Sequence, residues 1–234
     1  MQVIRSLLFN LIFYSTLVLT SICILFLYPL FSTKQLQIVT SKWIYFILQS
    51  LKKICGVRWR IKGIENIPST PCILVSNHQG PWESLFLQTL FIPFSGLALV
   101  PSGNIIIEKP EDNLFFPSDK TFLILLILFD LVSDMGFKHN KAHPKKGISN
   151  SSLLIMLEHG IKSFSSSCSV LSIRNNVPLI PICHNSGKYW KNRKFSKVPG
   201  IIDIVIGKPI ESNDIKKMTA LTEEWVKSQY SALN

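Results

Sequence analysis

Paired cysteines, acidic residues and metal-binding patterns are scarce in this chain of 234 residues. The five cysteines are scattered, and none forms a C-x-x-C pair, so we expect neither a disulfide framework nor a metal site. Acidic residues number 14 against 25 lysines and arginines, which leaves a formal net charge of +11. No zinc-finger spacing, RNA-binding signature or basic helix followed by heptads accompanies this charge, so no nucleic-acid partner is expected. Because 47% of the residues are hydrophobic, the charge instead favours an anionic lipid surface.

Charge is also absent from the stretch between Ser6 and Thr33, which is almost wholly apolar. A membrane span needs about 20 residues, so this stretch is long enough to cross a bilayer with tilt or a kink at Pro29. The alternative is a cleaved signal peptide, but the apolar run is too long and has no clear small-x-small site. Lysines follow the run and only Arg5 precedes it. The positive-inside rule therefore predicts a membrane anchor at residues 1–34, with the rest of the chain on the cytoplasmic side.

Residues 35–56 have helical periodicity. The apolar residues expected on one side are Trp43, Phe46, Ile47, Leu51 and Ile54, and lysines flank them. Such an amphipathic helix either lies on the membrane interface with its lysines reaching toward water or packs against an ordinary core. The sequence leaves both alternatives open.

Strand and helix patterns then alternate to the end of the chain. Residues 57–63 alternate in polarity, as in a half-exposed strand, and residues 72–75 and 179–183 are apolar runs typical of strands. Residues 201–206, which are apolar apart from Asp203, also indicate a strand. From about Asp214, apolar residues line one face of a closing helix. Strands interleaved with helices indicate a single α/β domain over residues 57–234.

A strand-to-helix turn in this domain carries the strongest chemical signal. The run that begins at Cys72 ends in a turn, and Pro81 suits the first position of a helix with Gly80 before it. His78 then lies on the turn and Glu83 in the first helical turn, so their side chains can meet although they are five residues apart. A carboxylate on one imidazole nitrogen fixes the tautomer and makes the other nitrogen a better general base. The alternative is a surface histidine followed by an unrelated helix-capping glutamate.

The residues of this turn, Asn-His-Gln-Gly-Pro-Trp-Glu-Ser from Asn77 to Ser84, resemble the first motif of the glycerolipid acyltransferases. They are most similar to the bacterial 1-acyl-sn-glycerol-3-phosphate acyltransferases, whose signature is Asn-His, four residues and an acid. The acid is usually Asp, and Glu83 adds one methylene that the turn must absorb. The resemblance implies that His78 and Glu83 are catalytic and that Asn77 binds substrate. It also implies a mixed sheet flanked by helices behind the N-terminal membrane helix.

Two further stretches extend the resemblance. An Ile-Pro-x-x-Gly sequence ends at Gly96, and an apolar pair followed by Glu108 and Lys109 keeps the charge order of the family's second motif. The resemblance makes Gly96 and Lys109 substrate-binding, although Lys lacks the bidentate fork of the usual Arg. The sequence Val-Pro-Leu-Ile-Pro-Ile-Cys-His-Asn-Ser-Gly, which includes Pro181, matches the fourth motif, and in the family that strand lines the acyl side of the site. We interpret His184 in this run as a structural histidine at a strand end, rather than as a second base.

The third motif of the family, Phe-Pro-Glu-Gly-Thr-Arg, is missing, and residues 110–169 form a divergent middle region. At the expected distance stands a basic turn, Pro-Lys-Lys-Gly-Ile-Ser from Pro144 to Ser149, which either cradles a phosphate or is a solvated loop. A second basic loop follows the fourth motif. It includes Lys188 and Arg193 with aromatic residues between them, which suits phospholipid headgroups or coenzyme A phosphates, although a solvated charge run is the alternative.

The resemblance therefore implies an O-acyltransferase, and the charge pattern around the anchor puts it at the cytoplasmic side of the cell inner membrane. It would transfer an acyl chain from acyl-CoA or acyl carrier protein, as co-substrate, to a lysophospholipid acceptor, 1-acyl-sn-glycerol-3-phosphate, and give phosphatidic acid. We expect no metal and no cofactor. The missing third motif leaves a non-catalytic, decayed member of the family as an alternative. An acyltransferase for another lysophospholipid is a further alternative.

Overall fold

The computed structural model describes residues 1–27, 30–31, 33–69, 72–91, 96–100, 104–108, 166–192 and 194–233. The predictions for Lys109, Arg193 and the basic turn at 144–149 lie outside the described residues. Only the last few residues of the divergent middle region are described, and they include the start of a helix at Ser167.

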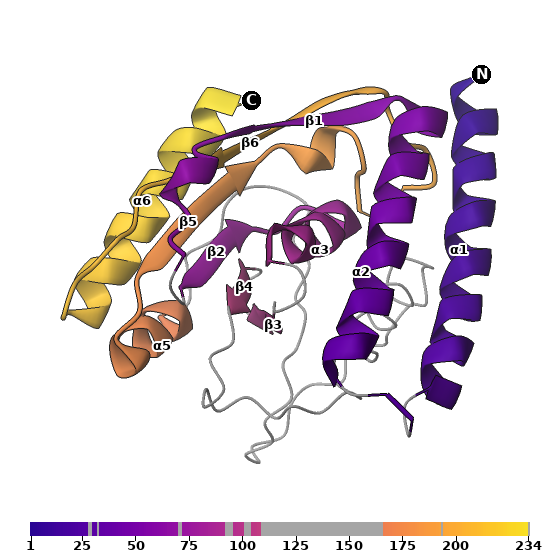
Figure 1. The fold of residues 1–234 in the computed structure, drawn as a ribbon. Helices are drawn as coiled ribbons and strands as arrows, with labels where there is room; N and C mark the ends of the chain where they lie inside the picture. Colours follow the sequence, from indigo (N-terminus) through magenta and orange to yellow (C-terminus); the bar gives the residue numbers. More distant parts are fainter. Residues whose placement is uncertain are drawn as a thin grey trace, which may run out of the picture.

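The described strands form one mixed, six-stranded sheet (Figure 1). Its strands are β1 (Val57–Lys62), β2 (Ile73–Asn77), β3 (Gly96–Val100), β4 (Asn104–Glu108), β5 (Leu179–His184) and β6 (Gly200–Ile206). Their order across the sheet is β1-β6-β5-β2-β4-β3. β1 pairs with β6 and β2 with β5 in parallel, and the other neighbours are antiparallel.

The parallel pair of β2 and β5 positions the candidate site. Ile73 is opposite Leu179 and Ser76 is opposite Ile182, so both strands end at the same edge of the sheet. The turns after the two strands, which hold the first and fourth motifs, therefore lie next to each other. All residues of both strands are buried, as expected for strands that are covered on both faces.

Helices cover the two faces of the sheet, and together they form the mixed sheet flanked by helices that the sequence predicted (Figure 1). The helices are α1 (Gln2–Leu27), α2 (Thr33–Ser50), α3 (Pro81–Gln88), α5 (Ser167–Asn175) and α6 (Ile215–Leu233), and a π-helical turn, η1 (Leu51–Cys55), continues α2. One core, which includes Leu74 of β2, lies between the sheet and α2 and α3. The other core, which includes Ile73 and Val75 of the same strand, lies under α5 and α6.

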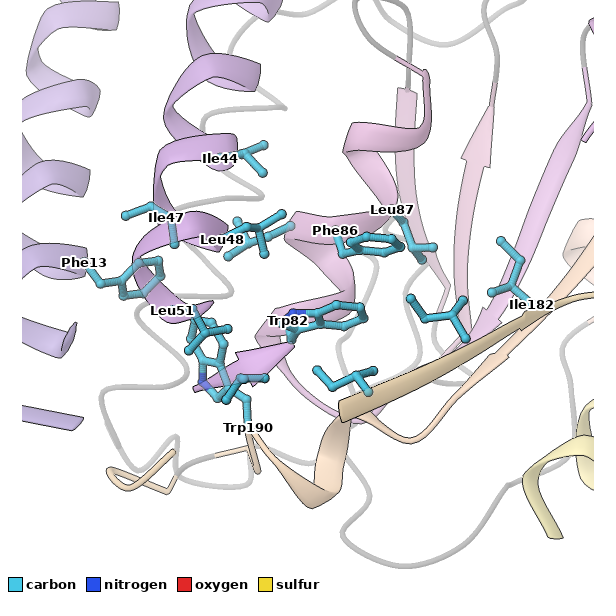
Figure 2. Close-up of a cluster of buried hydrophobic side chains, with 14 of the residues drawn as sticks. Phe13, Ile44, Ile47, Leu48, Leu51, Trp82, Phe86, Leu87, Ile182 and Trp190 are labelled. Atoms are coloured by element: carbon cyan, nitrogen blue, oxygen red, sulfur yellow. The ribbon is translucent and has the colours of Figure 1, made fainter. Parts of the chain in front are cut away.

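α2 packs against the core with the side that the sequence predicted. Trp43, Ile47 and Leu51 are buried. Figure 2 shows Ile44 and Leu48 on the side of α2 that faces α3, and Ile47 on the side toward Phe13 of α1. Phe46, which we expected on the same side, is instead 47% exposed. The inner side of α2 therefore follows the core-packing alternative, while the outer side presents aromatic surface.

α1 is long and apolar enough to cross a membrane, but it is also docked to the α/β domain. Phe9 and Phe13 are buried and meet the ring of Trp190 edge-on, with centroids 5.3 and 5.5 Å away. On the same side, the Asn10 side chain accepts a hydrogen bond of 2.8 Å from Nζ of Lys197, which is itself buried. The opposite side of the helix exposes large apolar side chains, among them Leu7, Leu11, Leu19, Ile22 and Phe26. One face of α1 thus belongs to the protein core, and the other is apolar surface.

Candidate active site

The first motif folds into the turn that the sequence predicted. β2 ends at Asn77, α3 begins at Pro81, and Gly80 is its N-cap residue. A Cβ on Gly80 would lie 2.8 Å from the carbonyl oxygen of Trp190. Glycine is required here because the turn passes so close to the backbone of the loop that follows the fourth motif.

Glu83, the third residue of α3, reaches back over this turn. Its Oε1 atom accepts a hydrogen bond of 2.7 Å from the backbone N–H of Gly80 and another from the N–H of Gln79. This is the glutamate half of a capping box, in which a longer acid at the third helical position satisfies the N-cap donor. Capping therefore explains how the turn accommodates the extra methylene of Glu83.

The same oxygen also faces the histidine. Nδ1 of His78 lies 2.9 Å from Oε1 of Glu83, and only 7% of the histidine side chain is exposed. The structure thus brings the two residues into the contact that the motif predicted. In the neutral histidine, an Nδ1–H donated to the carboxylate leaves the lone pair on Nε2 for proton transfer.

The electrostatics of the turn keep Glu83 ionised. The carboxyl is fully buried, and burial alone would raise its pKa. The electrostatic interaction with the nearby His184, the contact with His78 and the hydrogen bond from Gly80 act in the opposite direction and lower the pKa of Glu83 to about 2. An ionised carboxylate therefore faces His78 at neutral pH.

Asn77 and His184 join the ends of β2 and β5. The Asn77 amide donates to the His184 carbonyl at 2.9 Å and accepts from the His184 N–H at 3.0 Å. The Nε2 atom of His184 lies 2.7 Å from the Asn77 carbonyl oxygen. Burial lowers the pKa of His184, so the ring is neutral and its Nε2–H donates this bond. Both side chains bond the backbone here, which fits the structural interpretation of His184 and gives Asn77 a role in joining the two strands.

The residues after His184 complete the contact between the two motifs. The Ser186 hydroxyl donates to Oε2 of Glu83 at 2.8 Å, and the Gly187 N–H donates to the Gln79 side chain at 2.9 Å. Ser186 and Gln79 were not among the site residues predicted from the sequence. The Asn-Ser-Gly sequence of the fourth motif was the available signal, but nothing in it indicates a contact across more than 100 residues.

Three other predicted substrate-binding residues lie within the described part of the chain. Gly96 begins β3 and is opposite Glu108, which pairs with Ile73 at the end of β2 farthest from His78. Pro181 is buried within β5. Nζ of Lys188 lies on the surface and donates to the carbonyl of Leu233 in the last turn of α6 at 2.9 Å.

Metal binding finds no support in the part of the chain that the structure describes. Within those residues there is no group of three or more histidine, cysteine or acidic side chains able to hold an ion. The chemistry that this arrangement offers is that of a single base: an imidazole oriented by a buried carboxylate, with no side-chain nucleophile beside it in the motif.

The chain is similar to known acyltransferases over almost its whole length, although no protein-family model matches it. It is 24% identical to the 1-acyl-sn-glycerol-3-phosphate acyltransferase of Pseudomonas aeruginosa over 96% of this chain and 90% of that protein. Its fold resembles the crystal structure of the 1-acyl-sn-glycerophosphate acyltransferase PlsC of Thermotoga maritima, with a TM-score of 0.61, 16% identity and coverage of 99% and 95% of the two chains. The resemblance stated from the motifs and the predicted fold are both confirmed.

Proposed function

We propose that the chain is a membrane-bound O-acyltransferase that acylates 1-acyl-sn-glycerol-3-phosphate and gives phosphatidic acid for phospholipid synthesis. The contact of His78 with the buried, ionised Glu83 carries this proposal. The similarity to the Pseudomonas aeruginosa acyltransferase over 96% of the chain supports the choice of acceptor.

In the proposed reaction, Nε2 of His78 removes the proton from the free hydroxyl of the lysophosphatidate. The hydroxyl oxygen attacks the carbonyl carbon of an acyl thioester, and the tetrahedral intermediate collapses with release of the thiolate. The proton held by His78 then passes to the thiolate, so the base is regenerated. Glu83 remains ionised and stabilises the imidazolium that exists between these steps, as a carboxylate does for the histidine of other acyl-transfer sites.

The acyl donor in this proposal is acyl-CoA or acyl carrier protein, which is a co-substrate. No cofactor takes part, because a thioester is already activated and a single base suffices. Lys188 would have to release the carbonyl of Leu233 before it could bind a phosphate of either substrate. Lys109 and Arg193 stay proposed phosphate ligands on the strength of the motifs and the charge pattern alone.

The proposed site of action is the cytoplasmic face of the inner membrane. Support comes from α1, whose outward face exposes large apolar side chains along the length of the helix, including Leu7, Leu19 and Phe26. The lysines that follow this apolar stretch in the sequence favour the cytoplasmic side. The inner face of α1 meets Trp190, in the loop that touches the His78 turn. A membrane around the outer face would therefore hold the site close to lipid substrates.

The test is conversion of labelled lysophosphatidate to phosphatidic acid by membranes that contain the protein. The variant His78→Ala should lose acyl transfer, whereas Arg60→Gln, on the exposed side of edge strand β1, should keep it. Unchanged turnover by His78→Ala would exclude His78 as the base. Membranes that convert neither lysophosphatidate nor any other lysophospholipid would instead favour the decayed, non-catalytic alternative, and conversion of another lysophospholipid alone would change the acceptor.

A further inference from the structure

We propose that Ser186 is a positioning residue for the base, because its hydroxyl fixes the carboxylate of Glu83 in the orientation that His78 needs. The inference rests on the proposed function and adds to it. It also assigns the turn after β5 a role that differs from lining the acyl side of the site, which is what the family resemblance implied for this motif.

The two oxygens of Glu83 have separate partners. Oε1 receives the hydrogen bonds from the turn and from His78, while Oε2 receives the Ser186 hydroxyl at 2.8 Å. Ser186 and Glu83 are both completely buried. Without the serine hydroxyl, Oε2 would lose this donor and the buried carboxylate could rotate about its last torsion.

The serine itself is held rigidly. It begins the short 3-10 helix at Ser186–Lys188, and its N–H faces Nδ1 of His184 at 3.4 Å. Asn185 before it accepts the N–H of Asp203 at 2.9 Å, and Gly187 after it donates to Gln79 at 2.9 Å. The hydroxyl is therefore presented from a fixed backbone, as a group that orients another residue must be.

Charge makes this contact effective. A hydrogen bond to an ionised group is stronger than one between neutral groups, and the low dielectric of the interior strengthens it further. The serine hydroxyl contacts Glu83, and we assign its effect on His78 to this contact. Its loss should therefore lower the rate of the chemical step and leave substrate binding unchanged.

The experiment compares Ser186→Thr with Ser186→Val, which have nearly the same shape but differ in the hydroxyl. Ser186→Ala and the control Ser172→Ala are measured beside them, since Ser172 is a buried serine on α5 whose hydroxyl bonds the carbonyl of Val177, away from the site. Acyl transfer to lysophosphatidate gives kcat and KM for each. We expect Ser186→Ala and Ser186→Val to lose about 10- to 100-fold in kcat with KM unchanged, and Ser186→Thr and Ser172→Ala to stay near wild type.

A double-mutant cycle covers the case in which the added methyl group fits in neither the Thr nor the Val variant. We expect Glu83→Gln to have low but measurable activity, because the amide can still orient His78. In that background, Ser186→Ala should lower kcat by less than about threefold, because the charged acceptor is gone. An equal loss in both backgrounds, or a Val variant as fast as the Thr variant, would overturn the role of Ser186. A wild-type protein that converts no lysophosphatidate would overturn the proposed function, which is a separate outcome.

Discussion

Replacement of Glu83 by aspartate tests whether the observed geometry or the acid alone supports the proposed activity. Aspartate is the acid that the family most often has at this position, so the motif by itself predicts an active variant. The structure predicts the opposite. Glu83 contacts His78 at 2.9 Å, Gly80 at 2.7 Å and Ser186 at 2.8 Å, and all three contacts depend on the length of the side chain.

Removal of one methylene withdraws the carboxylate by about 1.5 Å, which is one carbon–carbon bond. Contacts of 2.7 to 2.9 Å then open beyond hydrogen-bonding distance unless the turn shifts. The turn resists such a shift because Gly80 already lies against the carbonyl of Trp190. Loss of one or two hydrogen bonds to a charged group corresponds to about 3 kcal/mol, or on the order of a 100-fold loss in kcat.

The assay is acyl transfer to lysophosphatidate by Glu83→Asp, with Glu223→Asp as the matched control. Glu223 lies on the outer face of α6 in an ion pair with Lys227, which is a surface contact of small energetic value. The control should behave as wild type in both activity and thermal unfolding. An aspartate variant with wild-type kcat would refute the reasoning, since it would show that the contacts of the longer side chain are not needed to orient His78.

Two predictions concern stability. Because the pKa of Glu83 falls from its ordinary value of 4.5 to about 2 on folding, this group contributes stability that is complete above pH 4.5 and lost as the pH falls toward 2. Between pH 4.5 and pH 2, the free energy of unfolding of wild type should fall by about 3 kcal/mol more than that of Glu83→Gln, as measured by thermal or denaturant unfolding. Parallel curves of unfolding free energy against pH would contradict the shift in the pKa of Glu83. The second prediction concerns α1: Asn10→Leu makes the helix more apolar, yet it removes the side-chain acceptor of the buried Lys197 ammonium and should destabilise the protein by about 3 kcal/mol. The double variant with Lys197→Met should recover most of that loss, because the charge that needs an acceptor is gone, and a double variant less stable than Asn10→Leu would contradict this account.

Local sequence sufficed for the turn that carries the candidate base. Proline at the first helical position, glycine before it and an acid at the third position are short-range signals, and the structure has α3 beginning at Pro81 as those signals predicted. The spacing of His78 and Glu83 likewise requires only the geometry of one turn, and the two side chains meet at 2.9 Å. The apolar runs also predicted buried strands, because a strand covered on both faces is apolar throughout.

Positions that depend on distant parts of the chain could not be read from local sequence. Gly96, which the resemblance makes substrate-binding, lies opposite Glu108, which pairs with the end of β2 farthest from His78. Strand order and direction depend on long-range pairing, which a pattern of period two does not encode. The exposure of Phe46 has a similar cause, since periodicity predicts which residues share a side of a helix but not how much of that side its neighbours cover.

By itself, the sequence determined the contact of His78 with Glu83, the mixed α/β fold implied by the family resemblance, and an N-terminal helix apolar enough for a membrane. Only the tertiary structure decided which residues support the base. Ser186 reaches Glu83 across 103 positions of sequence because β2 and β5 are parallel neighbours whose ends meet at one edge of the sheet. The hydrogen bond from Lys197 to Asn10 also depends on tertiary packing. The sequence of α1 alone does not show that Asn10 is buried, because this depends on the loop against which the helix packs.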